Sequence, residues 1–103
     1  MSKTIMLACA AGMSTSLLVT KMEKAAEEKG IDAKIFAVPA GEADAYVASS
    51  HPDVILLGPQ VRYLKAQFQE KYQPQGIPVD VIDMIDYGMM NGEKVLATAE
   101  ALL

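Results

Sequence analysis

The one cysteine of the chain, Cys9, is the residue best suited to covalent chemistry. It follows an apolar segment at residues 3–8 and precedes a run of small, apolar and hydroxylic residues at 10–16, after which a helix pattern begins. Free backbone N–H groups of a loop and of a helix N-terminus stabilise both a thiolate and a phosphate group. We therefore expect Cys9 to be a nucleophile beside an anion site.

The segment after Cys9 has the composition of a phosphate-binding loop. Gly12 can adopt a positive φ, and successive N–H groups in a curled backbone form an anion-binding nest. The hydroxyl groups near its end can donate hydrogen bonds or cap the following helix. We predict that the thiolate attacks a phosphoryl group, whose oxygens the loop then holds. The alternative is that Cys9 is a small buried core residue and the loop only a turn. The predicted phosphate-binding residues are Ala10, Ala11, Gly12, Met13, Ser14, Thr15 and Ser16.

The spacing resembles the Cys-x5-Arg-Ser/Thr loop of low-molecular-weight protein tyrosine phosphatases, with one departure. Thr15 stands at the arginine position, whereas Ser16 matches the final hydroxyl residue. A phosphatase arginine makes bidentate contacts with the phosphoryl oxygens, so its absence should slow hydrolysis. A phosphatase also needs an acid for the leaving group, and Asp83 or Asp86 is a candidate, although both residues are typical of loops and turns. A cysteine phosphatase therefore remains an alternative.

A non-catalytic regulatory module is less favoured, because the acidic Mg²⁺ pocket of receiver-like domains has no counterpart beside Cys9.

Composition excludes several other classes. A chain of 103 residues with a net charge of −4 and no Lys/Arg cluster is a single domain, residues 1–103, without a nucleic-acid partner. One histidine and one cysteine make no metal site, and no cofactor is expected. The apolar stretch before Cys9 is shorter than the roughly 7–15 residues of a signal peptide core, and no run approaches the ~18 residues of a membrane span. We expect a cytoplasmic protein.

Apolar runs and helical patterns alternate along the chain. Four strands are predicted at residues 3–8, 32–38, 54–57 and 78–82. Helices are predicted from residue 14 or 15 to 29, at 41–49, at 59–72 and, after a loop at 83–92, near the C-terminus. This order predicts a three-layer α/β sandwich with a four-stranded parallel sheet and helices on both faces. With the strand order 2-1-3-4, residues 32–38 form an edge strand. The cysteine loop and residues 58–60 would then border one crevice.

Three segments resemble the IIB components of the bacterial sugar phosphotransferase system, in the lactose/cellobiose/chitobiose family. They are residues 9–19 (CAAGMSTSLLV), residues 54–60 (VILLGPQ) and residues 78–83 (PVDVID) followed by Tyr87 and Gly88. The resemblance covers essentially the whole chain. It implies a four-stranded parallel sheet flanked by helices, and a phosphotransferase whose phosphoryl carrier is Cys9, with residues 10–16 as the cradle.

The resemblance also implies partners and a location. Cys9 would accept a phosphoryl group from a phosphohistidine of a IIA protein. It would pass the group to a sugar, such as cellobiose, chitobiose or lactose, during uptake by a membrane IIC protein. The chain would then be cytoplasmic, peripherally associated with the transporter and monomeric when free. Both transfers require Cys9 to lie near the surface, with exposed apolar residues around it as docking contacts; Met13 and Leu17 are candidates, although core packing is favoured for Leu17.

The remaining expectations concern single residues. Gln60 either hydrogen-bonds the phosphate loop or caps a helix. Tyr63 and Tyr87 can line the crevice, but packing against the core is favoured for both. His51 is expected in a surface loop without a role in phosphoryl transfer. Methionines are expected to fill the core or loops, at positions Met22, Met84, Met89 and Met90.

Overall fold

Four parallel strands form the centre of the molecule, in the order β2-β1-β3-β4. The computed structural model describes residues 3–10 and 13–103. The expected strand order is confirmed, and β2 is an edge strand as predicted. In the register of the sheet, Leu7 of β1 pairs with Ala37 of β2 and with Leu56 of β3. The strands are β1 (Lys3–Cys9), β2 (Ala33–Pro39), β3 (Val54–Leu57) and β4 (Val79–Val81).

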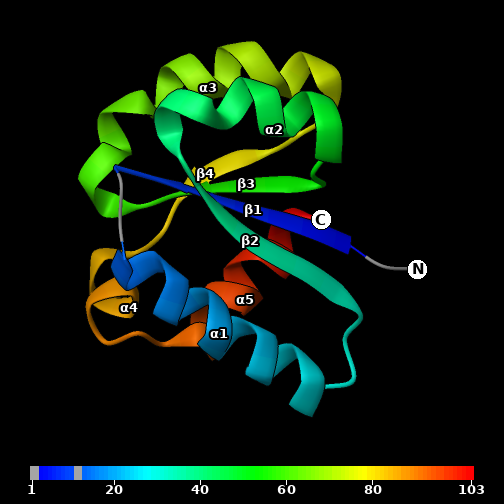
Figure 1. Cartoon of the computed structure of the whole chain (residues 1–103), viewed down its shortest axis with the longest axis vertical. Coiled ribbons are helices and arrows are strands. Elements are labelled where there is room, and N and C mark those ends of the chain that lie inside the picture. The colour runs from blue at the N-terminus through cyan, green and yellow to red at the C-terminus, as the bar shows by residue number, and fades with distance from the viewer. Residues whose placement is uncertain (1–2, 11–12) are drawn as a thin grey trace.

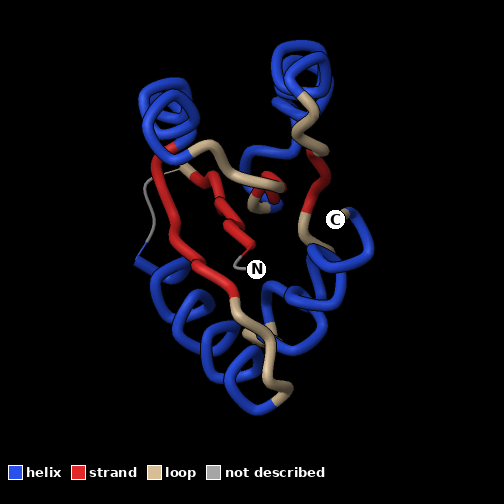
Figure 2. The backbone as a smooth tube through the Cα atoms, turned by 90° about the vertical axis from the view of Figure 1, so that its right-hand side faces the viewer, coloured by secondary structure: helices blue, strands red, loops and turns tan. Residues whose placement is uncertain are grey.

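Helices cover both faces of the sheet, so the predicted three-layer sandwich is confirmed. Figure 1 shows α2 and α3 on one face, with α1, α4 and α5 on the other; Figure 2 shows the strands between these layers from the side. The helices are α1 (Met13–Glu28), α2 (Ala43–Ser50), α3 (Lys65–Tyr72), α4 (Met84–Gly88) and α5 (Gly92–Leu102), with 3₁₀ segments η1 (Ala40–Glu42), η2 (Pro59–Leu64) and η3 (Gln73–Gln75).

The central strands separate two apolar clusters. Every residue of β3 is buried, as expected for a parallel strand with both faces covered. Successive side chains of β1 alternate between the clusters: Ile5 joins the one formed with α1 and α5, and Met6 the one formed with α2 and α3. The strand that leads to Cys9 is therefore packed against helices on both faces of the sheet.

The end of α1 follows the sequence pattern. Gly30 has φ +68°, and its N–H donates to the carbonyl of Glu27, while the N–H of Ile31 donates to that of Ala26. These two bonds form a Schellman motif, which a glycine in the left-handed region favours. The helix predicted to run to residue 29 therefore ends at this glycine.

Two predicted segments are wrong in detail. Residues 83–92 were expected to form a loop, but they contain α4, whose five residues are too few to show a helical period. The Asp83 carboxylate caps α4 by accepting hydrogen bonds from the N–H groups of Ile85 and Asp86. The helix expected at residues 59–72 is divided into the 3₁₀ segment η2, which non-helical backbone at Val61 interrupts, and α3. Within the described ranges, no helix has both the length and the apolar character needed to cross a bilayer.

Candidate functional site

Cys9 is the last residue of β1 and lies at the carboxyl edge of the sheet, next to Pro39 of β2. Its side chain is 5 % exposed, and Sγ lies 3.8 Å from the carbonyl oxygen of Val38, to which the thiol donates a weak hydrogen bond. Cys9 also lines a cavity of about 420 Å³, together with Ala10, Tyr63 and others. The thiol thus lies just below the surface, facing an open cavity.

The turn after β3 approaches Cys9 closely. The N–H of Gly58 donates to the carbonyl of Ala8 at 2.8 Å. A Cβ atom at position 58 would lie 3.5 Å from Cβ of Cys9 and 3.1 Å from Oε1 of Gln60. The two strand ends therefore meet as the strand order predicted, and the side chain of Gln60 lies beside the Gly58 turn. In η2 it does not act as a side-chain cap.

The predicted phosphate-binding residues differ in how far the structure describes them. Ala10 is exposed and lines the cavity with Cys9. Ala11 and Gly12, in the middle of the predicted phosphatase-like loop, lie outside the described residues. Met13 and Ser14 begin α1, so their backbone belongs to its first turn, where N–H groups lack partners within the helix. This turn follows Cys9 closely in the chain, consistent with an anion site there.

Thr15 and Ser16 point in different directions. The Thr15 side chain is 1 % exposed, and its Oγ1 lies 3.3 Å from the hydroxyl oxygen of Tyr87, 72 positions along the chain. Ser16 is exposed, and its carbonyl accepts a hydrogen bond from Thr20. Thr15 stands at the arginine position of the phosphatase loop. Its side chain therefore contacts α4 through Tyr87.

A second cavity, of about 800 Å³, opens beside the first. Tyr63 lines both cavities and is 76 % exposed, so its expected packing against the core is wrong. The reason is the irregular turn at Val61, which buries Val61 and leaves Tyr63 at the surface. Tyr87 is buried, as expected. The cavity is lined by Pro59, Gln60, Arg62, Tyr63, Met84, Tyr87 and Gly88.

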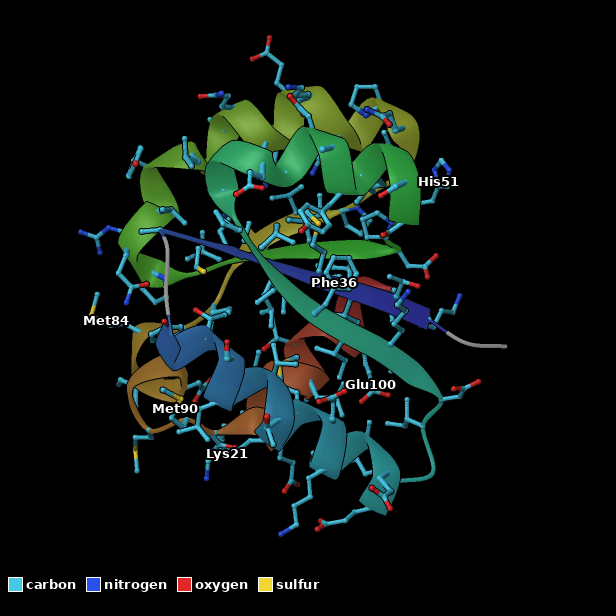
Figure 3. All side chains as sticks on the ribbon, in the orientation of Figure 1. Lys21, Phe36, His51, Met84, Met90 and Glu100 are labelled. Carbon is cyan, nitrogen blue, oxygen red and sulfur yellow. The ribbon has the colours of Figure 1, made fainter. Side chains whose placement is uncertain are left out.

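Large apolar side chains are exposed on the elements around this edge. Leu17 is 51 % exposed, which contradicts the expected core packing, because α1 turns the neighbouring Leu18 inward instead. Met84 is 60 % exposed on α4, so the prediction that it fills the core or a loop is wrong, whereas Met22 lies in the core as predicted. Met89, in the turn after α4, is 75 % exposed. Figure 3 shows Met84 at the outer surface of α4, on the side where the carboxyl end of β1 lies. We call Leu17, Tyr63, Met84, Ile85 and Met89 the apolar rim.

The other candidates lie away from this chemistry. Asp83 is occupied as the cap of α4, which weakens its case as a leaving-group acid. His51 is exposed at the end of α2, with φ +47°, and Figure 3 shows it at the opposite end of the molecule from Met84. Its expected place in a surface loop is confirmed.

Sequence reasoning missed the Thr15–Tyr87 contact and the position of Arg62 beside the larger cavity. No periodicity links positions 72 residues apart. The signal that could have found α4 was Asp83, a good N-cap residue followed by two apolar residues. Recognising this helix would have placed Tyr87 on an element next to the site.

These features define a parallel α/β domain with a cysteine at the carboxyl edge of its sheet, where such sheets bind ligands. The family model described as "PTS system, Lactose/Cellobiose specific IIB subunit" matches residues 4–98. The chain belongs to this family, and it is a IIB sugar phosphotransferase subunit of the lactose/cellobiose type.

Named relatives agree with this assignment over nearly the whole chain. It is 57 % identical to the galactose-specific EIIB component of Lactococcus lactis subsp. cremoris and 56 % identical to the cellobiose-specific EIIB component of L. lactis subsp. lactis. Each alignment covers 98 % of this chain and 96 % of the relative. The oligo-beta-mannoside-specific EIIB component of Bacillus subtilis is 45 % identical over the same shares of the two chains.

Solved structures show the same fold. The cellobiose-specific IIB component of Borrelia burgdorferi superposes with a TM-score of 0.79 at 46 % identity, covering 99 % of this chain and 92 % of that one. The lactose-specific IIB domain of Streptococcus pneumoniae has a TM-score of 0.83 at 17 % identity, covering 98 % and 97 %. The second likeness concerns the fold alone.

Proposed function

We propose that Cys9 is the phosphoryl carrier of this subunit. It accepts the group from a phosphohistidine of a IIA protein and delivers it to a sugar during uptake through a IIC protein. The observation that supports this most is the place of the thiol: the end of a buried central strand, at a cavity and four positions before the first residue of α1. A nucleophile at this position is fixed, and an incoming phosphoryl group can reach it.

The two transfers balance without a cofactor. In the first, the Cys9 thiolate attacks phosphorus, the S–P bond forms, and the P–N bond breaks with its electron pair left on the imidazole of the donor. In the second, a sugar hydroxyl attacks the same phosphorus and its proton passes to solvent, while the S–P bond breaks with its electron pair left on sulfur to return the thiolate. Cys9 therefore leaves the cycle unchanged.

Residues 10–16 form the phosphate cradle in this proposal. Ala10, at the cavity, and the first turn of α1, from Met13 to Ser16, provide N–H groups toward the phosphoryl oxygens; Ala11 and Gly12 complete the loop. Because Thr15 replaces the arginine of a phosphatase, attack by water on the phosphocysteine is weakly assisted. The phosphoryl group then persists until a sugar acceptor is docked.

The apolar rim is the docking surface for both partners, used in turn. Its side chains are exposed in the free subunit, and two of them, Tyr63 and Met84, line the cavities at this edge of the sheet, so a partner that reaches the thiol is expected to contact them. A subunit that exchanges partners is expected to use an apolar surface of this kind, open in the free state. Contact with the IIC protein places the chain in the cytoplasm, at the membrane surface.

The names of the relatives give the class of sugar. They include cellobiose-specific, galactose-specific and oligo-beta-mannoside-specific components. We infer that the acceptor of this chain is a β-linked disaccharide or a related sugar, bound by the transport protein.

Intact-mass spectrometry tests the proposal. The wild-type chain, incubated with a phosphorylated IIA protein, should gain the mass of one phosphoryl group, and peptide mapping should place it on Cys9. Cys9→Ala should gain none, while His51→Ala, which removes the single histidine, should be phosphorylated like the wild type. A phosphoryl group on any other residue would overturn the proposal. So would sustained, Cys9-dependent hydrolysis of an aryl phosphate, which would indicate a phosphatase instead.

A further inference from the structure

One buried hydrogen bond joins the phosphate site to the helix that bears much of the apolar rim. Thr15 lies in the first turn of α1, and its Oγ1 is 3.3 Å from the Tyr87 hydroxyl oxygen of α4. Both side chains are buried, at 1 % and 8 % exposure. We propose that Tyr87 is a positioning residue for phosphoryl transfer, which acts through Thr15 on the cradle. This inference rests on the proposed function of Cys9.

The two faces of α4 support this role. Tyr87 points inward to Thr15 and the core, whereas Met84, Ile85 and Met89 are exposed. A helix of five residues has little stability of its own, so its position depends on such tertiary contacts. A partner that docks on the outer face of α4 therefore contacts a helix whose inner face bonds to Thr15 of the cradle.

Thr15 replaces an arginine of the phosphatase loop, and its buried hydroxyl needs a hydrogen-bond partner. In the resembling phosphatase loop this position is an arginine, which contacts the phosphoryl group directly. Here the side chain is short and buried, and its hydroxyl bonds to Tyr87. A buried hydroxyl without a partner carries a desolvation penalty, so loss of the tyrosine hydroxyl should let the first turn of α1 shift. The N–H groups of that turn would then be misplaced relative to the phosphoryl oxygens.

Conservative variants separate positioning from stability. Tyr87→Phe removes only the hydroxyl, and Thr15→Val keeps the shape of threonine without it. Each should slow transfer from phosphorylated IIA protein about five- to tenfold, the effect of one lost hydrogen bond. Each should also shift the ³¹P resonance of the phosphocysteine. The double variant should be little slower than either single one, because the two groups act as a pair. Thr15→Ser, which retains the hydroxyl, should restore most of the rate.

Tyr72→Phe is the matched control. Tyr72 is 2 % exposed, and its hydroxyl donates to Asp44, on the α2 and α3 side of the sheet. Tyr72→Phe should lower the melting temperature as Tyr87→Phe does. It should keep the wild-type rate of phosphoryl transfer and the wild-type ³¹P resonance.

The outcomes distinguish the two proposals. If Tyr87→Phe lowers only the melting temperature, like Tyr72→Phe, the positioning role is overturned. Independent, multiplicative losses in the double variant would overturn it as well. If the wild-type chain is phosphorylated on Cys9 in either case, the proposed function stands. If the wild type accepts no phosphoryl group, the proposed function and this inference both fail.

Discussion

Gly58 and Cys9 approach so closely that a side chain at position 58 would enter the site. A Cβ atom there would lie 3.5 Å from Cβ of Cys9, an ordinary contact, but only 3.1 Å from Oε1 of Gln60. The φ of Gly58 is −63°, which any residue adopts, so the effect of a side chain here depends on the Gln60 amide and not on backbone freedom. The Gln60 amide therefore occupies the space that a side chain at position 58 would need.

Gly58→Ala should therefore affect transfer more than folding. The flexible end of Gln60 can move away, so the free energy of unfolding should change by about 1 kcal/mol or less. The displaced amide should slow phosphoryl transfer several-fold, measured as the initial rate of phosphocysteine formation. Gly41→Ala is the control, because a Cβ there meets nothing within 4 Å although Gly41 also lines the smaller cavity. Equal rates for the two variants would show that Gln60 has no part in the reaction.

The sequence predicts those parts of this fold that rest on repeating patterns. β1 and β3 are readable because each contains an apolar run, whereas β2 is readable from its alternation, and the strand order follows from general rules for parallel sheets. Cys9 and the segment after it are recognisable because the sequence itself contains the thiol, the glycine and the hydroxyl groups. The role of the phosphate loop stays a prediction, since Ala11 and Gly12 lie outside the described residues.

Patterns fail where single side chains or short elements decide the structure. Leu17 and Leu18 are adjacent leucines at the start of one helix, yet one is exposed and the other buried, a choice that depends on where α1 meets the sheet. The direction of Tyr63 depends on a local break in η2 at Val61. The Thr15–Tyr87 bond depends on the relative placement of α1 and α4, which only the complete fold determines.

Gly92→Ala should destabilise the protein strongly. Gly92 begins α5 where that helix crosses α1, and a Cβ there would lie 2.5 Å from the carbonyl carbon of Lys21 and 2.6 Å from the backbone nitrogen of Met22. Backbone atoms cannot yield as a side chain can, so the helices must separate, at a cost of about 3 kcal/mol. Urea unfolding measures this loss. Gly88→Ala, in open space at the end of α4, should remain within about 1 kcal/mol of wild type, and similar losses in both would contradict the steric explanation.

A charge on the apolar rim should weaken docking without weakening the fold. Ile85 is 70 % exposed, so Ile85→Lys should change the free energy of unfolding by only about 0.5 kcal/mol. Because a buried, unpaired ammonium group opposes an apolar contact, the KM for phosphorylated IIA protein should rise about tenfold or more, with kcat less affected. Leu103→Lys provides the control, since Leu103 is 45 % exposed at the C-terminus and outside the rim. An unchanged KM for Ile85→Lys would remove α4 from the docking surface.

Stability should fall in alkali because of Tyr72. Burial, and then its hydrogen bond to the Asp44 carboxylate, raise the pKa of this phenol above its ordinary value of 10.0. Below about pH 10 the folded and unfolded chains both keep the proton, so the contribution to stability is fully present there. Above that pH the unfolded chain releases the proton while the folded chain retains it. The free energy of unfolding must then decrease as the pH rises.

Urea unfolding at a series of pH values from 9 upward measures this slope. Tyr72→Phe should be less stable at neutral pH but should show a smaller loss in alkali. Asp44→Asn should reduce the slope only in part, because burial is the larger cause and remains. At the acid end, hydrogen bonds from Lys71 and Tyr72 lower the pKa of Asp44 from 3.8, so its stabilising contribution is present above that pH and is lost as the pH falls. An alkaline slope in Tyr72→Phe as steep as in the wild type would assign the effect to another group.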